Sequence, residues 1–324
     1  MDTLRSFPSS ASKQNCYKLP IFKQKLRYLV KSGFLYGDYD ALNRPPTFDL
    51  HIDGKKLSTI KISAAEEMII DELVYASKES GAMNLCFVEK KDSGVPFVSS
   101  IQVVPADGGL YSKMQLNETF RLVARLNFGE NQKWARKFSI DDKYERLWTS
   151  TTPANCNIVS TNIDYNSPEN NPPRFVMENA IESDVVSSPI ILTVDLPQSS
   201  SQPQSTYFVF YFTEKLMGFS NHSRTMNILI NGQKMSTVTT DPNKCTVITL
   251  YPVSVIGSTV NVTLASASST DLPPLINAME VFSRISMGGD SGGIGGSDPT
   301  VHFNYMSFVL MFSAYVLVFT TLLS

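Results

Sequence analysis

The sequence predicts an all-β protein built from two tandem β-sandwiches and followed by a C-terminal hydrophobic segment. Three observations predict this fold class. A segment that reads as a β-hairpin occurs twice, short β-branched or alternating apolar runs lie between turn residues, and the chain contains 18 Pro and 17 Gly. Short strands separated by turn residues are typical of antiparallel sheets that pack face to face.

The repeated hairpin is the most specific of these observations. Residues 48–59 read FDLHIDGKKLST, and residues 226–237 read MNILINGQKMST, at an offset of 178 residues. Each segment is an alternating strand, then Asp-Gly or Asn-Gly, then a second strand. These dipeptides favour a two-residue turn because both central positions need positive φ angles. We therefore predict hairpins that turn at Asp53-Gly54 and at Asn231-Gly232.

The same offset relates two further pairs of segments. Residues 95–103 (VPFVSSIQV) align with residues 273–281 (PPLINAMEV). Phe34, at the end of one apolar strand, aligns with Phe212, at the end of another. Three matches at one offset indicate an internal repeat, so the chain is predicted to contain two copies of one β-rich module.

Other short runs fit the same class. They are β-branched or alternating and are flanked by turn residues. The predicted strands are 122–128, 190–196, 246–251 and 260–264. The apolar spacing of residues 66–76 fits a helix about as well as a strand, and we predict a strand by analogy with its neighbours.

Composition bounds the function. The formal net charge is −2, from 28 basic and 30 acidic residues, so the sequence gives no indication of a nucleic-acid partner. Residues 134–148 are a mixed, solvated surface stretch rather than a basic patch. An apolar fraction of 42% is enough for a packed core.

The C-terminal residues predict a membrane attachment. Residues 306–323 carry no charge, and residues 288–297 upstream are mostly Gly and Ser. Small residues, a polar spacer and a terminal apolar run are typical of a GPI-attachment signal. We predict Ser291 as the attachment residue, with Gly293, Gly295 and Ser297 nearly as suitable. The alternative is a terminal transmembrane helix, because roughly 17–25 apolar residues can cross a bilayer.

Three N-glycosylation sequons support a secretory route. They begin at Asn117, Asn221 and Asn261. The first 20 residues contain no apolar run of the roughly 7–15 residues that a signal peptide requires. The two ends of the chain therefore point to different compartments.

The four cysteines are widely spaced. They are Cys16, Cys86, Cys156 and Cys245, and no CxxC or Cys/His cluster occurs, so a zinc or redox centre has little support. Four cysteines allow three pairings, and the sequence does not choose among them. The alternative is that they are buried free thiols.

A series of short motifs runs along the chain from about Leu4 to Ile285. The motifs are LRSFP (4–8), NCY (15–17), FLYGDYD (34–40), PTFDLH (46–51), RLNFG (125–129), YERLW (144–148), PP to VM (172–177) and LPPLINAMEV (272–281). In order and spacing they resemble the malectin-like domain that plant receptor-like kinases carry outside the cell ahead of leucine-rich repeats.

This resemblance implies a pair of malectin-like β-sandwiches packed side by side. We expect a first sandwich over residues 1–107, a second over 118–286, a Gly/Ser-rich linker over 287–304 and a hydrophobic tail over 305–324. Family members begin with a secretion signal and several strands before the Arg-Ser-Phe-Pro segment. This chain opens almost on that segment, so we expect an incomplete first sandwich and a signal peptide missing from this sequence.

The sequence offers no catalytic constellation. It contains no Gly-x-Ser-x-Gly, no His-Glu-x-x-His, no kinase phosphate loop and no catalytic-loop Asp. The three histidines predict no catalyst, since His51 lies in a strand, His222 in a sequon and His302 in the C-terminal spacer. We therefore predict a protein that is not an enzyme and needs neither cofactor nor metal.

Carbohydrate binding is the better candidate. Sugars are recognised by aromatic faces together with carboxylates or amides. The loop after the Phe34 strand offers Tyr36, Asp38, Tyr39, Asp40 and Asn43. The resemblance supports this loop, because in animal malectin aromatic residues also follow the corresponding strand. The alternative is that Tyr36 and Tyr39 pack structurally.

The expected function is that of a non-catalytic ectodomain on the extracellular face of the cell membrane. It would bind a glycan or peptide ligand and act as an accessory to a receptor kinase. The alternative is a truncated receptor ectodomain that serves as a protein-interaction scaffold and has no sugar site.

Overall fold

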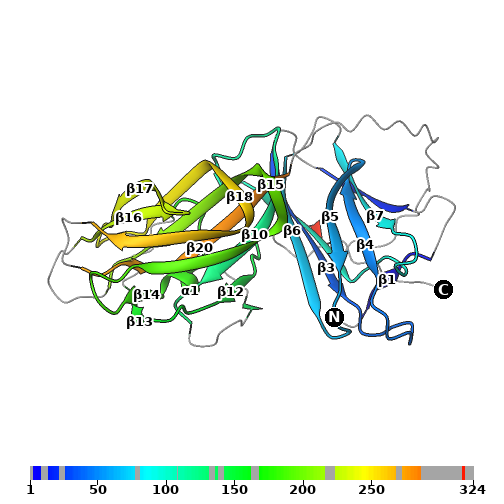
Figure 1. Ribbon diagram of the computed structural model, residues 1–324. Coiled ribbons are helices and arrows are strands. Elements are labelled where there is room, and N and C mark those ends of the chain that lie inside the picture. Colours follow the sequence, from blue (N-terminus) through cyan, green and yellow to red (C-terminus); the bar gives the residue numbers. More distant parts are fainter. Residues whose placement is uncertain are drawn as a thin grey trace. The chain divides into compact units, whose positions relative to one another are not determined.

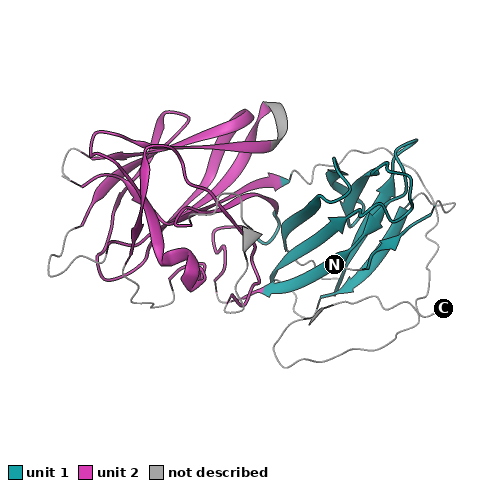
Figure 2. Cartoon of the chain, turned by 90° about the horizontal axis from the view of Figure 1, so that it is seen from below, with its two compact units in different colours: residues 1–105, 116–119, 285–324 teal, residues 106–115, 120–284 magenta. Residues whose placement is uncertain are grey.

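The computed structural model describes residues 3–8, 14–21, 26–76, 81–107, 109–130, 136–137, 142–161, 168–215, 223–267, 272–285 and 316–317. Strands dominate these ranges, and the one helix within them is the single turn α1 (Arg174–Met177). The all-β prediction is therefore confirmed. The chain divides into two compact units, which Figure 2 colours separately. Unit 1 comprises residues 1–105, 116–119 and 285–324, and unit 2 comprises residues 106–115 and 120–284.

Unit 1 contains the first nine strands and a two-residue strand from the end of the chain (Figure 1). They are β1 (Arg5–Ser6), β2 (Gln14–Pro20), β3 (Arg27–Leu35), β4 (Thr47–Ile52), β5 (Lys55–Lys61), β6 (Met68–Ala76), β7 (Ala82–Glu89), β8 (Phe97–Val98), β9 (Ser100–Ala106) and β21 (Val316–Leu317). One sheet has the order β2-β7-β4-β5. In the other, β6, β3, β9 and β21 are successive neighbours, while β1 pairs with β8. The strand predicted for residues 66–76 is β6.

The core of unit 1 lies between these two sheets. Strand β4 alternates buried and half-buried residues, so Phe48, Leu50 and Ile52 share one face. Phe48 lies 5.5 Å from Phe34 of β3, measured between ring centroids, and 5.9 Å from Phe97 of β8. One apolar cluster takes side chains from both sheets, as expected for a β-sandwich.

Unit 2 contains the remaining strands. They are β10 (Thr119–Asn127), β11 (Arg136–Lys137), β12 (Trp148–Ser150), β13 (Cys156–Ser160), β14 (Asn179–Ser183), β15 (Ile190–Phe212), β16 (Thr225–Ile230), β17 (Gln233–Thr239), β18 (Thr246–Ser266), β19 (Leu275–Ile276) and β20 (Ala278–Ile285). The main strand order is β17-β16-β18-β15-β20-β10, and a smaller sheet has the order β13-β14-β19. The buried side chains of these strands form a second apolar cluster.

Strands β15 and β18 are longer than the sequence predicts. The strands expected at 246–251 and 260–264 are parts of one 21-residue strand, and the strand expected at 190–196 continues to Phe212. The separate boundaries were therefore wrong. The register of the β15–β18 pair shifts between Asp195 and Ser200, between Ser200 and Gln204, and between Thr206 and Phe208. Such bulges let a strand bend and continue through residues that read as turns.

Both predicted hairpins are present and have the same internal geometry. Asp53 and Gly54 have φ angles of 47° and 76°, and Asn231 and Gly232 have φ angles of 48° and 79°. Positive φ at both central positions is the signature of the predicted turn. The two hairpins also share a register shift at equivalent places, next to Leu50 in one and next to Ile228 in the other.

The turn residue makes equivalent hydrogen bonds in the two units. The Asp53 N–H donates to the carbonyl of Asn84 at 2.9 Å, and the Asn84 N–H donates to Asp53 Oδ1 at 3.0 Å. The Asn231 N–H donates to the carbonyl of Asn261 at 2.8 Å, and the Asn261 N–H donates to Asn231 Oδ1 at 2.9 Å. In each unit this pair of bonds ties the hairpin to the neighbouring strand.

A second equivalence lies where β8 meets β9 and β19 meets β20. The Ser99 N–H donates to the carbonyl of Gly33 at 2.9 Å, and Ser99 Oγ accepts from the Leu35 N–H at 3.0 Å. The corresponding bonds of unit 2 are Asn277 N–H to the Tyr211 carbonyl at 3.0 Å and Thr213 N–H to Asn277 Oδ1 at 2.7 Å. All three positions are related by the offset of 178 residues.

One disulfide is observed, so two of the four cysteines are paired and two are not. Cys16 and Cys86 face each other across β2 and β7 and are joined by a disulfide. Cys156 and Cys245 are free thiols. Burial raises the pKa of the Cys156 thiol to about 11 and that of Cys245 to about 12, which keeps both protonated at neutral pH.

The predicted membrane attachment falls almost wholly outside the described residues. Ser291, the linker and all of the tail except Val316 and Leu317 lie there, as does Asn221. The described parts of the chain contain no helix that is both long and apolar enough to cross a bilayer.

Candidate ligand-binding site

The loop between β3 and β4 holds the residues that the sequence predicts for a ligand site. Four of its residues, Gly37, Asp38, Ala41 and Asn43, adopt positive φ angles of 59°, 50°, 55° and 47°. Gly, Asn and Asp tolerate this region well, and short polar side chains satisfy the backbone of such tight loops. The loop is therefore a series of tight turns whose side chains have defined positions.

Tyr36 lies beneath the loop. Its side chain is fully buried, and its ring contacts Tyr39 and Phe97 at centroid distances of 5.5 and 6.2 Å. The Tyr36 hydroxyl donates to Asp40 Oδ1 and accepts from the Arg44 N–H at 3.4 Å. Burial raises the pKa of Tyr36 to about 12, and the hydrogen bond to the Asp40 side chain adds to the rise. Tyr36 thus supports the loop from below.

The two loop carboxylates each fix the backbone with one oxygen. Asp38 Oδ1 accepts from the Asn43 N–H at 2.7 Å, and Asp40 Oδ1 accepts from the Leu42 N–H at 3.2 Å. Within the described chain, Asp40 Oδ2 has no hydrogen-bond donor. The loop therefore offers a free acceptor atom on a fixed backbone, which is the arrangement that recognises hydroxyl groups.

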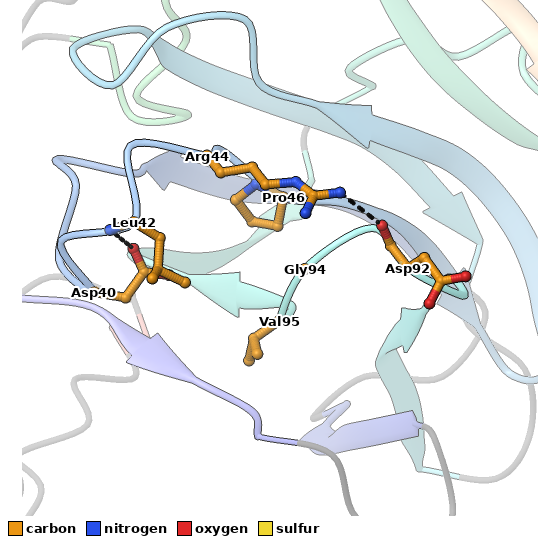
Figure 3. A pocket seen from close by; sticks show the side chains of 7 residues that line it. All are labelled: Asp40, Leu42, Arg44, Pro46, Asp92, Gly94 and Val95. Atoms are coloured by element: carbon orange, nitrogen blue, oxygen red, sulfur yellow. Dashed lines mark hydrogen bonds between the residues drawn. The ribbon is translucent and has the colours of Figure 1, made fainter.

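A pocket of about 270 Å³ lies between this loop and the turn that joins β7 to β8 (Figure 3). Its lining residues are Asp40, Leu42, Arg44, Pro46, Asp92, Gly94 and Val95. Arg44 Nη2 donates to the backbone carbonyl of Asp92 at 3.2 Å and so ties the two walls together. Gly94 has a φ angle of 83°, and a Cβ atom there would lie 2.9 Å from Pro46 Cβ, so glycine keeps the walls this close.

The predicted residues have different places relative to this pocket. Asp40 lines it, while Asp38 and Asn43 stabilise the loop beside it. Tyr39 is 37% exposed and packs against Phe97 at 5.7 Å. The turn residues Asp92 to Val95 were missed, because they lie about 50 positions away in sequence and reach the loop only through the pairing of β4 with β7. The Asp-Ser-Gly sequence at 92–94 is typical of a turn, but the sequence does not indicate which loop this turn contacts.

The equivalent region of unit 2 is occupied by buried ion pairs. At the offset of 178 residues, Glu214 stands at the position of Tyr36 and Arg224 at that of Pro46. The buried Arg224 donates through Nε to Glu214 Oε1 at 2.8 Å and through Nη1 to Glu182 Oε1 at 3.1 Å. Arg224 Nη1 also donates to the carbonyl of Pro273, which corresponds to Val95. Arg224 is thus held by buried hydrogen bonds at the position that Pro46 occupies in the pocket wall of unit 1.

A second buried cluster of charged and polar groups lies in the interior of unit 2. Arg125 Nε, Tyr111 OH and Tyr211 OH each donate to the Glu280 carboxylate at 2.6 Å. All four side chains are buried. Burial raises the pKa of Tyr211 well above its usual range, and the charge of Glu280 adds to the rise. This cluster stabilises the core and presents no group to a substrate.

In the part of the chain that the structure describes, no three His, Cys, Asp or Glu side chains come close enough together to hold a metal ion. Asn117 and Asn261, the first residues of two sequons, are exposed. Asn261 lies on β18, and its carboxamide oxygen accepts from Thr193 Oγ1 at 2.8 Å. His51 lies on β4 and is half-buried, and burial lowers its pKa.

We expect Tyr36→Phe to lower the free energy of unfolding by about 1.5–3 kcal/mol at pH 7, because a hydrogen bond to a charged group is lost. The pKa of Tyr36 is higher in the folded state than the roughly 10 of an unfolded tyrosine. Its contribution is therefore complete below pH 10 and falls as the pH rises toward 12. Urea unfolding at pH 7 and pH 10.5 measures both effects. An unchanged midpoint at pH 7 would show that the hydroxyl does not hold the loop.

Comparison with known proteins covers nearly the whole globular part. A profile of the malectin-like domain family matches residues 1–284. The chain is 27% identical over 288 residues to the probable LRR receptor-like serine/threonine-protein kinase At1g51860 of Arabidopsis thaliana, covering 88% of this chain and 31% of the kinase. It is 28% identical over 297 residues to the uncharacterized protein At1g24485 of the same plant, covering 90% and 57%. The chain therefore spans less than two thirds of these relatives.

Solved structures give the same fold. The ANX2 ectodomain of Arabidopsis thaliana matches with a TM-score of 0.67 and 14% identity, covering 88% of this chain and 83% of that one. The plant receptor-like kinase FER matches with a TM-score of 0.65 and 18% identity, covering 91% and 85%. At these identities the likeness concerns the fold alone.

Proposed function

Because the chain belongs to the malectin-like domain family, we propose that it is a non-catalytic, cell-surface binding protein whose unit 1 holds a carbohydrate ligand. The pocket between the β3–β4 loop and the β7–β8 turn is the proposed site. The observation that carries the proposal is the combination of the Asp40 carboxylate and the Arg44 guanidinium with apolar lining residues in one pocket.

The chemistry of the lining fits a sugar. A sugar ring presents C–H groups on its faces and hydroxyls at its edges, so it needs an apolar wall and polar groups that both donate and accept. Leu42, Pro46 and Val95 provide the apolar wall. Asp40 and Arg44 provide an acceptor and a donor whose positions are fixed by bonds to the backbone. A preorganised binding site loses less conformational entropy when the ligand binds.

The proposal assigns the site to unit 1 alone. At the position of Pro46, unit 2 has Arg224 with its carboxylate partners, and removing that arginine from its partners would leave buried charges unpaired.

We propose no chemical step on the ligand. The strongly interacting charged groups of unit 2 pair with each other, as Arg146 does with Asp142 at 2.9 Å. In unit 1 the pocket carboxylates lie beside an arginine and aliphatic side chains, without a nucleophile and base in contact within the described residues.

The proposed location is the extracellular face of the cell membrane. The cross-strand disulfide supports an oxidising compartment, and the exposure of the sequon residues Asn117 and Asn261 supports glycosylation there. We further propose that residues 305–324 attach the protein to the membrane, as a GPI signal processed at Ser291 or as a transmembrane helix.

We also propose that the chain consists of two tandem malectin-like sandwiches over residues 1–107 and 118–286. The equivalent hairpins and the equivalent bonds at Ser99 and Asn277 support this organisation. The relationship to receptor-like kinases supports a role beside a receptor kinase.

A peptide ligand is the second candidate. Leu42 lines the pocket and is 69% exposed, so an apolar side chain of a peptide could cover it. The third candidate is a scaffold without a ligand site. It predicts no binding of small ligands at all.

The full chain, purified in detergent, is expected to bind a subset of an oligosaccharide array, and the double variant Asp40→Ala/Arg44→Ala is expected to weaken that binding at least tenfold. These two residues supply the acceptor and the donor on the ligand. Binding is measured by array and then by calorimetry. Undiminished binding in the double variant would remove the proposed site.

Ile191→Ala is the matched control, since Ile191 is an exposed side chain of unit 2. It should bind as the wild type does. Binding of peptides without sugars at the same residues would favour the second candidate, and no binding of either class would favour the scaffold.

A further inference from the structure

The outer face of one sheet in unit 2 carries a sequon beside an exposed apolar side chain. Asn261 and Thr263, the first and last residues of that sequon, lie on the face of β18 away from the core, because Val262 between them is fully buried. Strand pairing places Thr193 of β15 opposite Asn261, and Ile191 opposite Thr263. Ile191 is 57% exposed. It is therefore the diagonal neighbour of Asn261, roughly 7–8 Å away.

The Asn261 side chain has a fixed orientation. Its Oδ1 accepts from Thr193 Oγ1 at 2.8 Å, which directs the carboxamide toward β15, the strand that bears Ile191. Its backbone N–H donates to Asn231 Oδ1 at 2.9 Å, and its backbone carbonyl accepts from the Asn231 N–H at 2.8 Å. For Asn261 Nδ2 the described residues provide no hydrogen-bond partner. The atom that would carry a sugar is therefore available, next to an exposed isoleucine.

Ile191 also lies at the edge of its sheet. Residues 190–196 of β15 pair with β18 on one side. The other described partner of β15 is β20, which pairs only with residues 206–211. Among the described strands, residues 190–196 therefore form an edge. An open edge that bears an exposed apolar side chain invites pairing with another chain, and native proteins commonly cover such edges.

Unit 1 secures the equivalent edge in another way. Asn84 is the counterpart of Asn261, because each exchanges the same two bonds with the turn of its hairpin. In unit 1 the edge strand β2 is joined to β7 by the disulfide between Cys16 and Cys86. In unit 2 the two places of that disulfide are taken by Ile191 and the last residue of the sequon. Unit 2 thus has a sequon where unit 1 has a covalent link.

We propose that Asn261 carries an N-linked glycan whose innermost sugar packs on Ile191 and protects the edge formed by residues 190–196. The proposal rests on the extracellular location proposed above and is independent of the pocket in unit 1. The donor is an oligosaccharide linked to a lipid diphosphate. The bond between the anomeric carbon of its first sugar and the diphosphate oxygen breaks, and that carbon bonds to Asn261 Nδ2. Nδ2 releases a proton, and the lipid diphosphate leaves.

The first test asks whether Asn261 is modified. The full chain is produced behind a secretion signal in a eukaryotic host that adds N-glycans, and is purified in detergent. Enzymatic release of the glycans in heavy-oxygen water converts each modified asparagine to a labelled aspartate, which peptide mass spectrometry detects. We expect label at residue 261 in the wild type and in Thr263→Ser, which keeps the sequon. Thr263→Val keeps the branched shape, removes the sequon and should show no label there.

Label at Asn117 without label at Asn261 would overturn the inference. Such a result would leave the proposed location intact, because the labelled Asn117 shows that the chain had passed through the glycosylating compartment. The oligosaccharide array on the unit 1 pocket tests the proposed function separately.

The second test asks whether the sugar packs on Ile191. We expect the amides of residues 190–196 to exchange hydrogen roughly fourfold faster in Thr263→Val than in the wild type, the factor for uncovering about one methylene group. Thr263→Ser should match the wild type. In an Ile191→Thr background, Thr263→Val should change the exchange by less than about twofold, because the sugar has lost its apolar contact.

Asn117→Gln is the matched control, since it removes another sequon and should leave the exchange of residues 190–196 unchanged. The same acceleration by Thr263→Val in both backgrounds would show that the sugar does not pack on Ile191. Unchanged exchange in Thr263→Val, in a protein whose thermal unfolding is normal, would show that the glycan does not protect this edge. Either result would overturn the inference.

Discussion

Glu280→Ala is expected to lower the free energy of unfolding by about 3–5 kcal/mol, because it leaves a buried charge without its partner. Glu280 accepts from Arg125 Nε, Tyr111 OH and Tyr211 OH, each at 2.6 Å, and its side chain is fully buried. Its removal leaves the Arg125 charge without its carboxylate in the interior, and the two hydroxyls without their acceptor. Urea denaturation of the full chain measures the loss.

Two further variants separate charge from volume. Glu280→Gln keeps the size of the side chain and removes only its charge, so it should show most of the same loss. Glu178→Ala removes a half-exposed carboxylate that lies 3.5 Å from Arg174, and it should cost less than about 1 kcal/mol. A loss below about 1 kcal/mol for Glu280→Ala would mean that the cluster is not a stabilising centre of unit 2.

Cys16→Ser/Cys86→Ser is expected to destabilise unit 1 by about 2–4 kcal/mol. The disulfide closes a loop with a sequence separation of 70 residues, and cross-linking a long loop restricts the unfolded chain strongly. The variant should also loosen β2, because this edge strand has β7 as its one neighbour in the sheet. Hydrogen exchange of the β2 and β7 amides, together with urea unfolding, reports both effects.

Cys156→Ser is the matched control because Cys156 is a free thiol in unit 2. It should leave the exchange of the β2 amides unchanged. Equal protection of β2 in the wild type and in the double variant would show that strand pairing alone holds this edge.

The hairpins were predictable because the residues that determine them are neighbours in the sequence. Asp-Gly and Asn-Gly set both φ angles of the turn, and the alternation on each side sets which residues are buried. The long strands were not predictable in this way. Their continuity through residues 197–206 depends on bulges that form only when β15 finds its register on β18.

The candidate site shows the same division. The sequence drew attention to the loop at 36–43, where aromatic and acidic residues are concentrated. The burial of Tyr36 depends on Phe97, and the second wall of the pocket depends on Asp92 and Gly94. Phe97 and the turn at Asp92 and Gly94 reach the loop only through strand pairing. The residues involved are too far apart in the sequence for a local pattern to predict this contact.

The disulfide illustrates a third case. The sequence allowed three pairings, and the choice follows from the register that places Cys16 opposite Cys86. In the same register the buried Leu19 lies opposite the buried Met83. The disulfide therefore depends on the pairing of two strands whose cysteines are 70 positions apart in the sequence.

The matching hairpins of the two units create a hazard while the polypeptide is being made. The two hairpins share the turn type and the position of the register shift, so either could pair with the strands of the other unit. Such exchange is a way in which chains with repeated domains misassemble. Their inward side chains differ, with Phe48, Leu50 and Ile52 in one and Met226, Ile228 and Ile230 in the other. An exchanged hairpin would leave one interior underfilled and the other crowded, so unequal shapes keep each copy in its own place.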